Sequence, residues 1–307
     1  MSTPPASTAR DQQLAQILLF ITPAMFTTNM VMARATADFI PPVALAFWRW
    51  TGVCLVLGLL CGRELWRHRA AIREEAGQFA VLGFLGMVIC GAGVYWGAAS
   101  TTATNIGLIY ATSPVIIILL SRIWFGEAMN LRQGLGTALA LTGVLVIVLR
   151  GDIAVLKSLS FSLGDLLILA ASVAWAVYTV LLKRWPTKLS VNGRLAGITG
   201  AGALLLLPGL VLETISAGPP AMDGRTLLAI ITLIIVPGIG AYSTYGYMTK
   251  HLGPSKTGLM LYLSPIYTAV MAWVLLGESF AFYHWIGSAL VLPGLYLATH
   301  KPQQETA

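Results

Sequence analysis

The sequence predicts an all-α membrane protein in which ten transmembrane helices form two inverted repeats of five helices. Three observations predict this fold: the composition, the spacing of the apolar runs and an internal repeat. Of the 307 residues, 57% are hydrophobic and only 10% are charged, whereas soluble domains carry about a quarter charged residues. A surface of this composition would not stay in water, so a soluble enzyme with a single membrane anchor is excluded.

The apolar runs are long enough for ten helices that each cross the hydrocarbon, which takes about 20 residues. They lie at residues 14–33, 43–62, 77–99, 103–125, 133–149, 163–182, 193–212, 226–248, 257–276 and 283–299. No cleavage-like segment follows the first run, which is therefore expected to be a retained helix. The expected organisation is a cytoplasmic leader at 1–13, a first five-helix repeat at 14–149, a periplasmic connection at 150–162, a second five-helix repeat at 163–299 and a cytoplasmic tail at 300–307.

The basic residues predict the orientation of these spans. With a cytoplasmic N-terminus, 14 of the 19 Lys and Arg residues fall in cytoplasmic segments, 4 fall in periplasmic segments and Arg49 lies within a span. Because cytoplasmic segments of membrane proteins are rich in Lys and Arg, both termini are predicted to be cytoplasmic. The formal charge of +7 forms no patch interleaved with aromatic residues, so no nucleic-acid partner is expected.

The two halves of the chain repeat each other at a shift of 151 residues. Identical residues occur at 11 of 37 positions, where biased composition alone gives roughly three or four. The pairs are Gly107-Leu108 with Gly258-Leu259, Ser113-Pro114 with Ser264-Pro265, Gly126-Glu127 with Gly277-Glu278, Gly136 with Gly287, Ala138-Leu139 with Ala289-Leu290, Leu141 with Leu292, and Gly143 with Gly294. Because each repeat has an odd number of helices, the second repeat must lie upside down relative to the first. Inverted repeats with a site between them are typical of secondary transporters.

The repeated element resembles a known family. Residues 114–127 are an apolar run ending in Gly-Glu and followed by two glycines seven residues apart, and residues 265–278 repeat this pattern. The pattern resembles the EamA signature of the drug/metabolite transporter superfamily. The segment 164–176 resembles the start of that family's second repeat, and the segment 47–50 resembles the arginine-aromatic start of its second helix. The resemblance implies a bacterial inner-membrane exporter with a central cavity, and overall similarity suggests a likeness to an exporter of aromatic amino acids.

Motifs for catalysis, nucleotide binding or metal binding are missing, so we expect no enzyme activity, no cofactor and no metal. Cys54, Cys61 and Cys90 lack CxxC spacing, and the four histidines do not cluster. All twelve acidic residues fall at span ends or in connections. An intramembrane carboxylate is the usual proton relay and the usual partner of a lipophilic cation. Its absence favours a neutral or zwitterionic substrate.

Aromatic side chains at or near mid-depth are the candidates for a substrate pocket. Tyrosine hydroxyls need a partner that lipid cannot supply, so these rings are expected to face the interior. The predicted substrate-binding residues are Tyr110, Trp175, Tyr178, Tyr242, Tyr245, Tyr262, Asn29 and Ser113. Packing without a ligand is the alternative for each of them. Tryptophans near span ends, Trp50 included, are assigned to an interfacial belt.

Two prolines and one arginine stand out within the spans. Pro114 and Pro265 remove a helix hydrogen bond at matched places and are predicted hinges, with a static kink as the alternative. Arg49 could hold a substrate carboxylate. The alternatives are that it extends to the membrane surface or pairs with a backbone carbonyl or Asp38.

Glu127 and Glu278 are the best-matched acidic residues of the repeat. Each ends an apolar helix and precedes a turn. We expect them to shape that turn by accepting backbone hydrogen bonds and not to bind a ligand.

These features predict a secondary transporter that exports neutral, aromatic amino acids by alternating access. Another small uncharged metabolite or drug is the alternative substrate, and a membrane scaffold or membrane enzyme is the alternative of a different class. The expected partners are a small-molecule substrate and the lipid bilayer. A monomer is compatible with the sequence, which leaves the oligomeric state open.

The charge distribution leads to a topology test. Reporters fused at both termini, and one placed between Arg63 and Arg73, should be cytoplasmic, and a reporter at Asp223 should be periplasmic. Alkaline phosphatase and green fluorescent protein fusions measure this directly. Termini on opposite sides would rule out the ten-helix arrangement and the inverted repeat with it.

Overall fold

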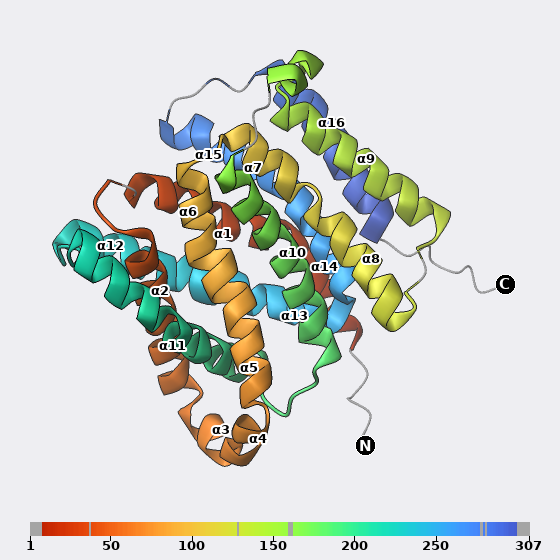
Figure 1. The fold of residues 1–307 in the computed structure, drawn as a ribbon. Coiled ribbons are helices and arrows are strands. Elements are labelled where there is room, and N and C mark those ends of the chain that lie inside the picture. Colours follow the sequence, from red (N-terminus) through yellow and green to blue (C-terminus); the bar gives the residue numbers. More distant parts are fainter. Residues whose placement is uncertain are drawn as a thin grey trace.

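The computed structural model describes residues 8–36, 38–127, 129–158, 162–276, 279 and 281–299, which form helices joined by short connections (Figure 1). The first half contains α1 (Ala9–Thr36), α2 (Pro42–Leu60), α3 (Gly62–Arg67), α4 (Arg69–Glu74), α5 (Ala76–Gly83), η1 (Phe84–Gly93), α6 (Val94–Ala99), α7 (Ala103–Tyr110), α8 (Ser113–Phe125) and α9 (Leu131–Val148). A short 3-10 helix, η2 (Ile153–Ser158), precedes the second half. The second half contains α10 (Leu163–Arg184), α11 (Val191–Ala217), α12 (Gly224–Leu233), η3 (Ile234–Ala241), α13 (Tyr242–Leu252), α14 (Pro254–Gly258), η4 (Leu259–Leu263), α15 (Ser264–Leu276) and α16 (Phe282–Thr299).

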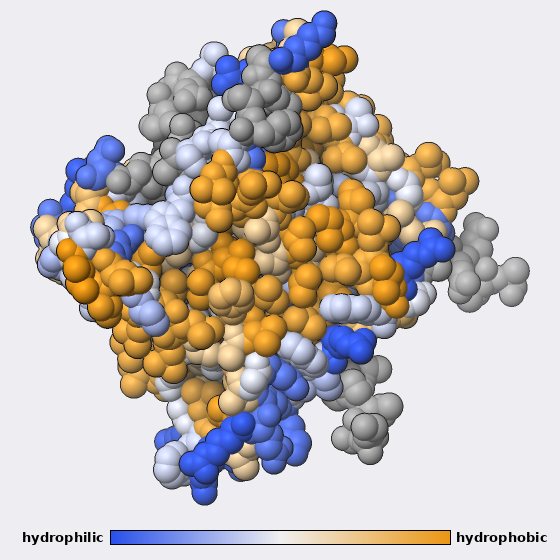
Figure 2. All heavy atoms as spheres, viewed as in Figure 1, coloured by the Kyte–Doolittle hydropathy of each residue, from blue (hydrophilic) through white to orange (hydrophobic). Residues whose placement is uncertain are grey.

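The predicted all-α membrane fold is confirmed. Eight stretches of the described chain are long and apolar enough to cross a membrane, and the segment from α14 to α15 and the helix α16 lie where the ninth and tenth spans are predicted. Large apolar side chains face outward, for example Leu59, which is 85% exposed. Figure 2 shows apolar surface over the middle of this face and hydrophilic residues near α3 and α4. Lipid, not water, suits such a surface.

Polar caps set where several of the helices begin. Asn130 caps α9 in a reciprocal box with Gln133, Ser190 caps α11, and Asp223 caps α12. A cap side chain accepts a hydrogen bond from a backbone N–H that has no partner within the helix. Each of these helices therefore begins about two residues before its apolar run, since hydropathy alone does not register the cap.

Helices α2 and α11 lie against each other and cap each other's N-termini. Glu213, near the end of α11, accepts hydrogen bonds from the backbone N–H groups of Val43 (3.0 Å) and Ala44 (2.7 Å) at the start of α2. Glu64, just past the end of α2, accepts from the backbone N–H and the hydroxyl of Ser190 at the start of α11. A carboxylate at a helix N-terminus also interacts favourably with the helix dipole. The two contacts are counterparts in antiparallel helices, as an inverted repeat requires.

Helices α9 and α16 are the second cross-half pair, and they lie side by side in Figure 1. Their backbones touch at the repeat glycines. A Cβ atom at Gly143 would lie 2.6 Å from the carbonyl oxygen of Gly287, and one at Gly136 would lie 2.6 Å from that of Gly294. Only glycine permits this approach, because every larger residue carries a Cβ. The seven-residue glycine spacing of the sequence thus serves helix packing.

Four spans are irregular, and the irregularities lie at matched places in the two halves. η1 and η3 are π-helical segments inside the third and eighth spans, and π-segments occur often at functional sites. The fourth and ninth spans are interrupted just before Ser113 and Ser264, where α8 and α15 begin. Pro114 and Pro265, the second residues of those helices, therefore lie beside backbone breaks. Whether these breaks act as hinges stays a prediction.

The α9–α16 crossing leads to a stability test. Gly143→Ala should lower the thermal midpoint of the purified protein in detergent, because forcing a methyl group into packed backbone costs about 1–3 kcal/mol. The control is Gly58→Ala in α2, where nothing lies within 4 Å of the added Cβ. Alanine in an open helical position stabilises by about 0.5–1 kcal/mol, so the control should not lose stability. An unchanged midpoint for Gly143→Ala would contradict the close crossing.

Candidate functional site

Four of the predicted pocket residues meet where α10 and α13 pack together. Trp175 and Tyr178 lie one turn apart on α10, and Tyr242 and Tyr245 lie one turn apart on α13. The ring centroid of Trp175 is 5.4 Å from that of Tyr178, 5.5 Å from that of Tyr242 and 4.8 Å from that of Tyr245. All four side chains are buried. The i,i+3 spacing seen in the sequence therefore puts each pair on one face, and the two faces meet.

Two rings that were not predicted to line the pocket complete the cluster. Phe26 of α1 lies 5.5 Å from the ring centroids of Trp175 and Tyr242 and 5.9 Å from that of Tyr245. Trp50 of α2 lies 4.9 Å from that of Tyr242. We call these six residues the aromatic centre: Phe26, Trp50, Trp175, Tyr178, Tyr242 and Tyr245. It combines two helices of the first half with two of the second.

The assignment of Trp50 to an interfacial belt is wrong. Its side chain is 0% exposed, whereas Trp66, another tryptophan of that assignment, is 72% exposed. Trp50 lies eight residues into α2, which is about 12 Å along the helix. Two features of the sequence could have identified Trp50 as a buried residue: its position well inside the span, and the charged residue Arg49 next to it.

Polar groups of the protein satisfy two of the buried tyrosine hydroxyls. The Tyr245 hydroxyl lies 2.7 Å from Thr179 Oγ1, and the Tyr242 hydroxyl donates to the carbonyl oxygen of Gly86 in η1 at 3.3 Å. The indole N–H group of Trp50 is buried without a partner among the described residues. A buried donor without a partner costs about 1–3 kcal/mol, so a ligand that accepts from this indole gains that energy.

A cation lies against the aromatic centre. The Arg49 side chain is 2% exposed, and its Nη1 atom donates to Asn29 Oδ1 (2.7 Å) and to the Tyr95 hydroxyl (3.2 Å). Tyr95 in turn donates to Asn29 Oδ1 at 2.7 Å. We call Asn29, Arg49 and Tyr95 the polar triad. Arg49 thus does not extend to the membrane surface. The described partners of Asn29 are Arg49 and Tyr95, and its predicted contact with substrate stays a prediction.

The polar triad touches the aromatic centre through Arg49. The guanidinium carbon lies 4.1 Å from the ring centroid of Trp50 and 5.8 Å from that of Tyr242. A cation over an aromatic face is attracted by the ring quadrupole, and this attraction is stronger away from water. Phe26 and Asn29 lie one turn apart on α1, so one helix face contributes to both groups.

The remaining predicted pocket residues lie elsewhere in the core. Tyr262 packs in a cluster with Leu263 and Val291, and Tyr110 packs against the cluster around Ile168. Ser113 Oγ lies 2.7 Å from the hydroxyl of Ser172. Described ring contacts do not link Tyr110 or Tyr262 to the aromatic centre. Their role in a pocket stays a prediction.

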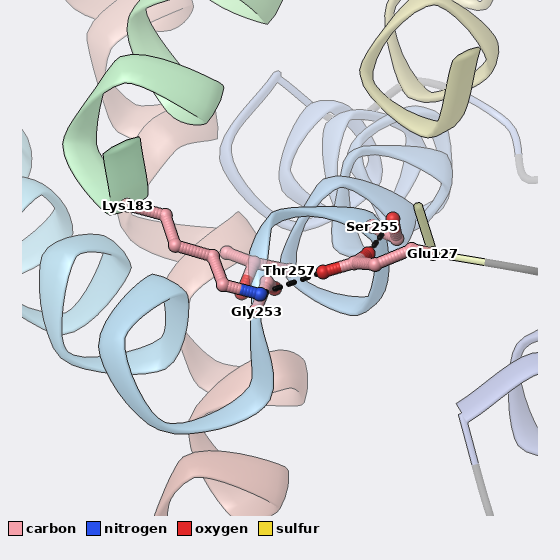
Figure 3. A network of polar contacts seen from close by, with 5 residues as sticks. All are labelled: Glu127, Lys183, Gly253, Ser255 and Thr257. Atoms are coloured by element: carbon pink, nitrogen blue, oxygen red, sulfur yellow. Dashed lines mark hydrogen bonds and ion pairs between the residues drawn. The ribbon is translucent and has the colours of Figure 1, made fainter. Parts of the chain in front are cut away.

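Glu127 binds the opposite half of the molecule and does not merely shape its own turn. The helix α8 ends at Gly126, which has a positive φ of 65°. Figure 3 shows Glu127 between Lys183 at the end of α10 and Ser255 of α14, with Oε1 to Nζ and Oε2 to Oγ distances of 2.7 and 2.6 Å. Its described partners are therefore side chains of the second half. Glu278, the repeat counterpart, lies outside the described residues.

A groove of about 390 Å³ opens beside the aromatic centre, between α1, α11 and α13. Leu14 and Leu18 line one wall, and Ser243, Thr244 and Tyr247 line another. Its residues lie toward the predicted cytoplasmic ends of α1, α11 and α13. Ser243 follows Tyr242 in α13, so the groove reaches the helix that carries two rings of the centre.

Comparison with known proteins identifies the relatives of the chain. The model of the EamA-like transporter family matches residues 13–149 and 162–299, once in each half. The chain is similar to an uncharacterized transporter of Archaeoglobus fulgidus, with 28% identity over 94% of this chain and 98% of that protein.

Two further relatives carry a substrate in their names. The chain is 27% identical to a probable terminal-alkyne amino-acid exporter of Streptantibioticus cattleyicolor over 73% of each chain. It is 22% identical to a probable amino-acid metabolite efflux pump of Escherichia coli over 92% of this chain and 93% of that one. A solved crystal structure superimposes with a TM-score of 0.73 at 22% identity, over 93% of this chain and 97% of the other. That likeness concerns the fold alone.

Proposed function

The chain belongs to the EamA-like transporter family, and we propose that it exports neutral amino acids with aromatic side chains across the bacterial inner membrane, with both termini in the cytoplasm. The family is one of transporters, so the chain is a multi-pass membrane transporter and not an enzyme. The names of two relatives, an amino-acid exporter and an amino-acid metabolite efflux pump, support an amino-acid substrate.

The aromatic centre is the observation that carries this proposal. Phe26 and Trp50 come from the first half, and Trp175 and Tyr242 come from the second, so the rings lie where the halves meet. Secondary transporters with inverted repeats bind substrate at that interface near the middle of the membrane. Aromatic pairs contribute about 0.5–1.5 kcal/mol beyond the burial of their area. A substrate ring that enters when the halves part would replace ring contacts that opening breaks.

We infer alternating access of the substrate to the aromatic centre, because the protein encloses the centre. Its side chains other than Phe26 are buried, so the substrate reaches them only after a rearrangement. The proposed entry point is the groove between α1, α11 and α13, which lies toward the predicted cytoplasmic ends of these helices. The irregular segments η1 and η3 flank the rings, since Gly86 of η1 binds the Tyr242 hydroxyl and Tyr242 directly follows η3. Segments of this kind bend more readily than regular helix.

The first test concerns transport itself. Purified protein in liposomes should show counterflow of labelled phenylalanine without an imposed proton gradient, because the predicted spans contain no carboxylate at mid-depth to relay a proton. Liposomes without protein give the background. Counterflow that requires a proton gradient would reveal a proton site that the sequence does not indicate, and no counterflow of any aromatic amino acid would overturn the proposed substrate class.

The second test concerns selectivity. Trp175→Ala should lower kcat/KM for phenylalanine about tenfold relative to that for alanine, since it removes about 1.4 kcal/mol of ring contact. The matched control is Trp66→Ala, which removes an exposed indole outside the spans. The control should leave the ranking of substrates unchanged. If Trp175→Ala changes only the amount of protein in the membrane, Trp175 serves packing alone.

A further inference from the structure

Arg49 is a buried cation that has no anionic partner among the described residues. Its side chain is 2% exposed, and the ion pair described in the structure, between Lys183 and Glu127, lies elsewhere. Among the described residues, Arg49 has only the neutral groups of Asn29 and Tyr95 as hydrogen-bond partners. Removing a charge from water costs several kcal/mol unless an opposite charge compensates it. The fold therefore holds a positive charge in a place where an anion would be stabilised.

The free edge of the guanidinium has the geometry for a carboxylate. Both described hydrogen bonds use Nη1. The Nε atom is buried without a partner among the described residues, and no described hydrogen bond involves Nη2. Nε and Nη2 are parallel donors, and they match the two oxygens of a carboxylate in a bidentate pair. Asn29 and Tyr95 hold the opposite edge, so the donor pair has a fixed direction.

Two unpartnered donors meet at this edge. Arg49 Nε and the indole N–H group of Trp50, whose ring lies under the guanidinium, are both buried without a partner among the described residues. An ammonium group needs acceptors, and the Asn29 carbonyl oxygen already accepts from Arg49 and Tyr95. The faces of Trp50 and Tyr242 could attract a cation, but Arg49 already lies 4.1 and 5.8 Å from their centroids. Like charges at such distances repel in a medium of low dielectric constant.

We propose that the Nε–Nη2 edge of Arg49 binds the carboxylate of the transported molecule, and that the substrate class is aromatic monocarboxylates whether or not they carry an amino group. This proposal rests on the proposed function, because it places the substrate ring in the aromatic centre. Asn29 and Tyr95 act as positioning residues. The protein selects its substrate by the carboxylate, which Arg49 binds, and by the ring, which the aromatic centre binds. The amino group of the substrate contributes little to affinity.

Three ligands that differ in one group each test this proposal on the unmodified protein. Binding of phenylalanine, 3-phenylpropionate and phenethylamine to purified protein in detergent is measured by isothermal titration calorimetry. We expect the Kd values of phenylalanine and 3-phenylpropionate to agree within about threefold, and that of phenethylamine to be at least tenfold higher. That difference is typical of losing a charge-assisted hydrogen bond, with tenfold equal to 1.4 kcal/mol.

The outcomes separate the two proposals. If phenylalanine binds, but phenethylamine binds equally well or 3-phenylpropionate does not bind, the carboxylate proposal is overturned while the proposed function stands. If no aromatic ligand binds and no aromatic amino acid shows counterflow, the proposed function fails. This comparison uses no variant, so it holds even where substitution of Arg49 prevents folding.

Variants then assign the effect to Arg49. Arg49→Gln should raise the Kd of 3-phenylpropionate at least tenfold, and Arg49→Lys should recover part of the loss, since lysine restores the charge but not the paired donors. The matched control is Arg225→Gln, because Arg225 also lies over an aromatic ring, 4.0 Å from the Phe39 centroid, but is exposed. It should bind like the unmodified protein. A folded Arg49→Gln variant with unchanged affinity would overturn the proposal.

Discussion

Hydrocarbon offers no hydrogen-bond partner, so a polar group of this chain within the bilayer is stabilised only by a partner inside the protein or by a ligand. Several side-chain hydroxyls find such a partner. Thr27 donates to the carbonyl of Pro23 one turn earlier, and Thr22 donates to the hydroxyl of Thr244 on a neighbouring helix at 2.9 Å. The same constraint draws the tyrosine hydroxyls and the guanidinium of Arg49 inward, away from lipid. The interior of the bundle is therefore where chemistry is available, and its outer surface is left apolar.

The two halves of the molecule contact each other through different kinds of interaction in different places. At the ends, charged or polar groups link them, as in the Glu64 contact with Ser190 and the Glu127 contact with Lys183 and Ser255. At the α9–α16 crossing, backbone packs on backbone. Near the middle, rings meet rings. Polar links at a helix end can be exchanged for water when that end opens, whereas the glycine crossing has no such substitute. A rearrangement that parts the ends while keeping the crossing is consistent with this distribution.

The aromatic centre is stabilised by apolar contact and the polar triad by a negative charge, and a single ligand could supply both. The rings are apolar surfaces that are stable when covered, and the guanidinium is a charge that burial destabilises. Asn29 and Tyr95 supply dipoles to Arg49 but no negative charge. A molecule with a ring at one end and a carboxylate at the other would satisfy both groups at once. A small lipophilic cation fits this site poorly, since the positive charge of Arg49 already lies over the rings of Trp50 and Tyr242.

The sequence by itself determined the apolar character and approximate positions of the helices, the repeat and its glycines, and the presence of a charge in the second span. These follow from hydropathy and spacing, which run along the chain in one dimension. The depth of a residue in the membrane is such a property, and Trp175, Tyr178, Tyr242 and Tyr245 were found in this way. Tertiary structure alone decided which rings meet. Phe26 and Trp50 belong to the aromatic centre, whereas Tyr110 and Tyr262 pack elsewhere. Tertiary structure also decided that Glu127 pairs with a side chain of the other half. The physical reason is that these helices are apolar on nearly every side, so the direction of a side chain around its helix axis depends on the neighbouring helices and leaves no pattern in the sequence.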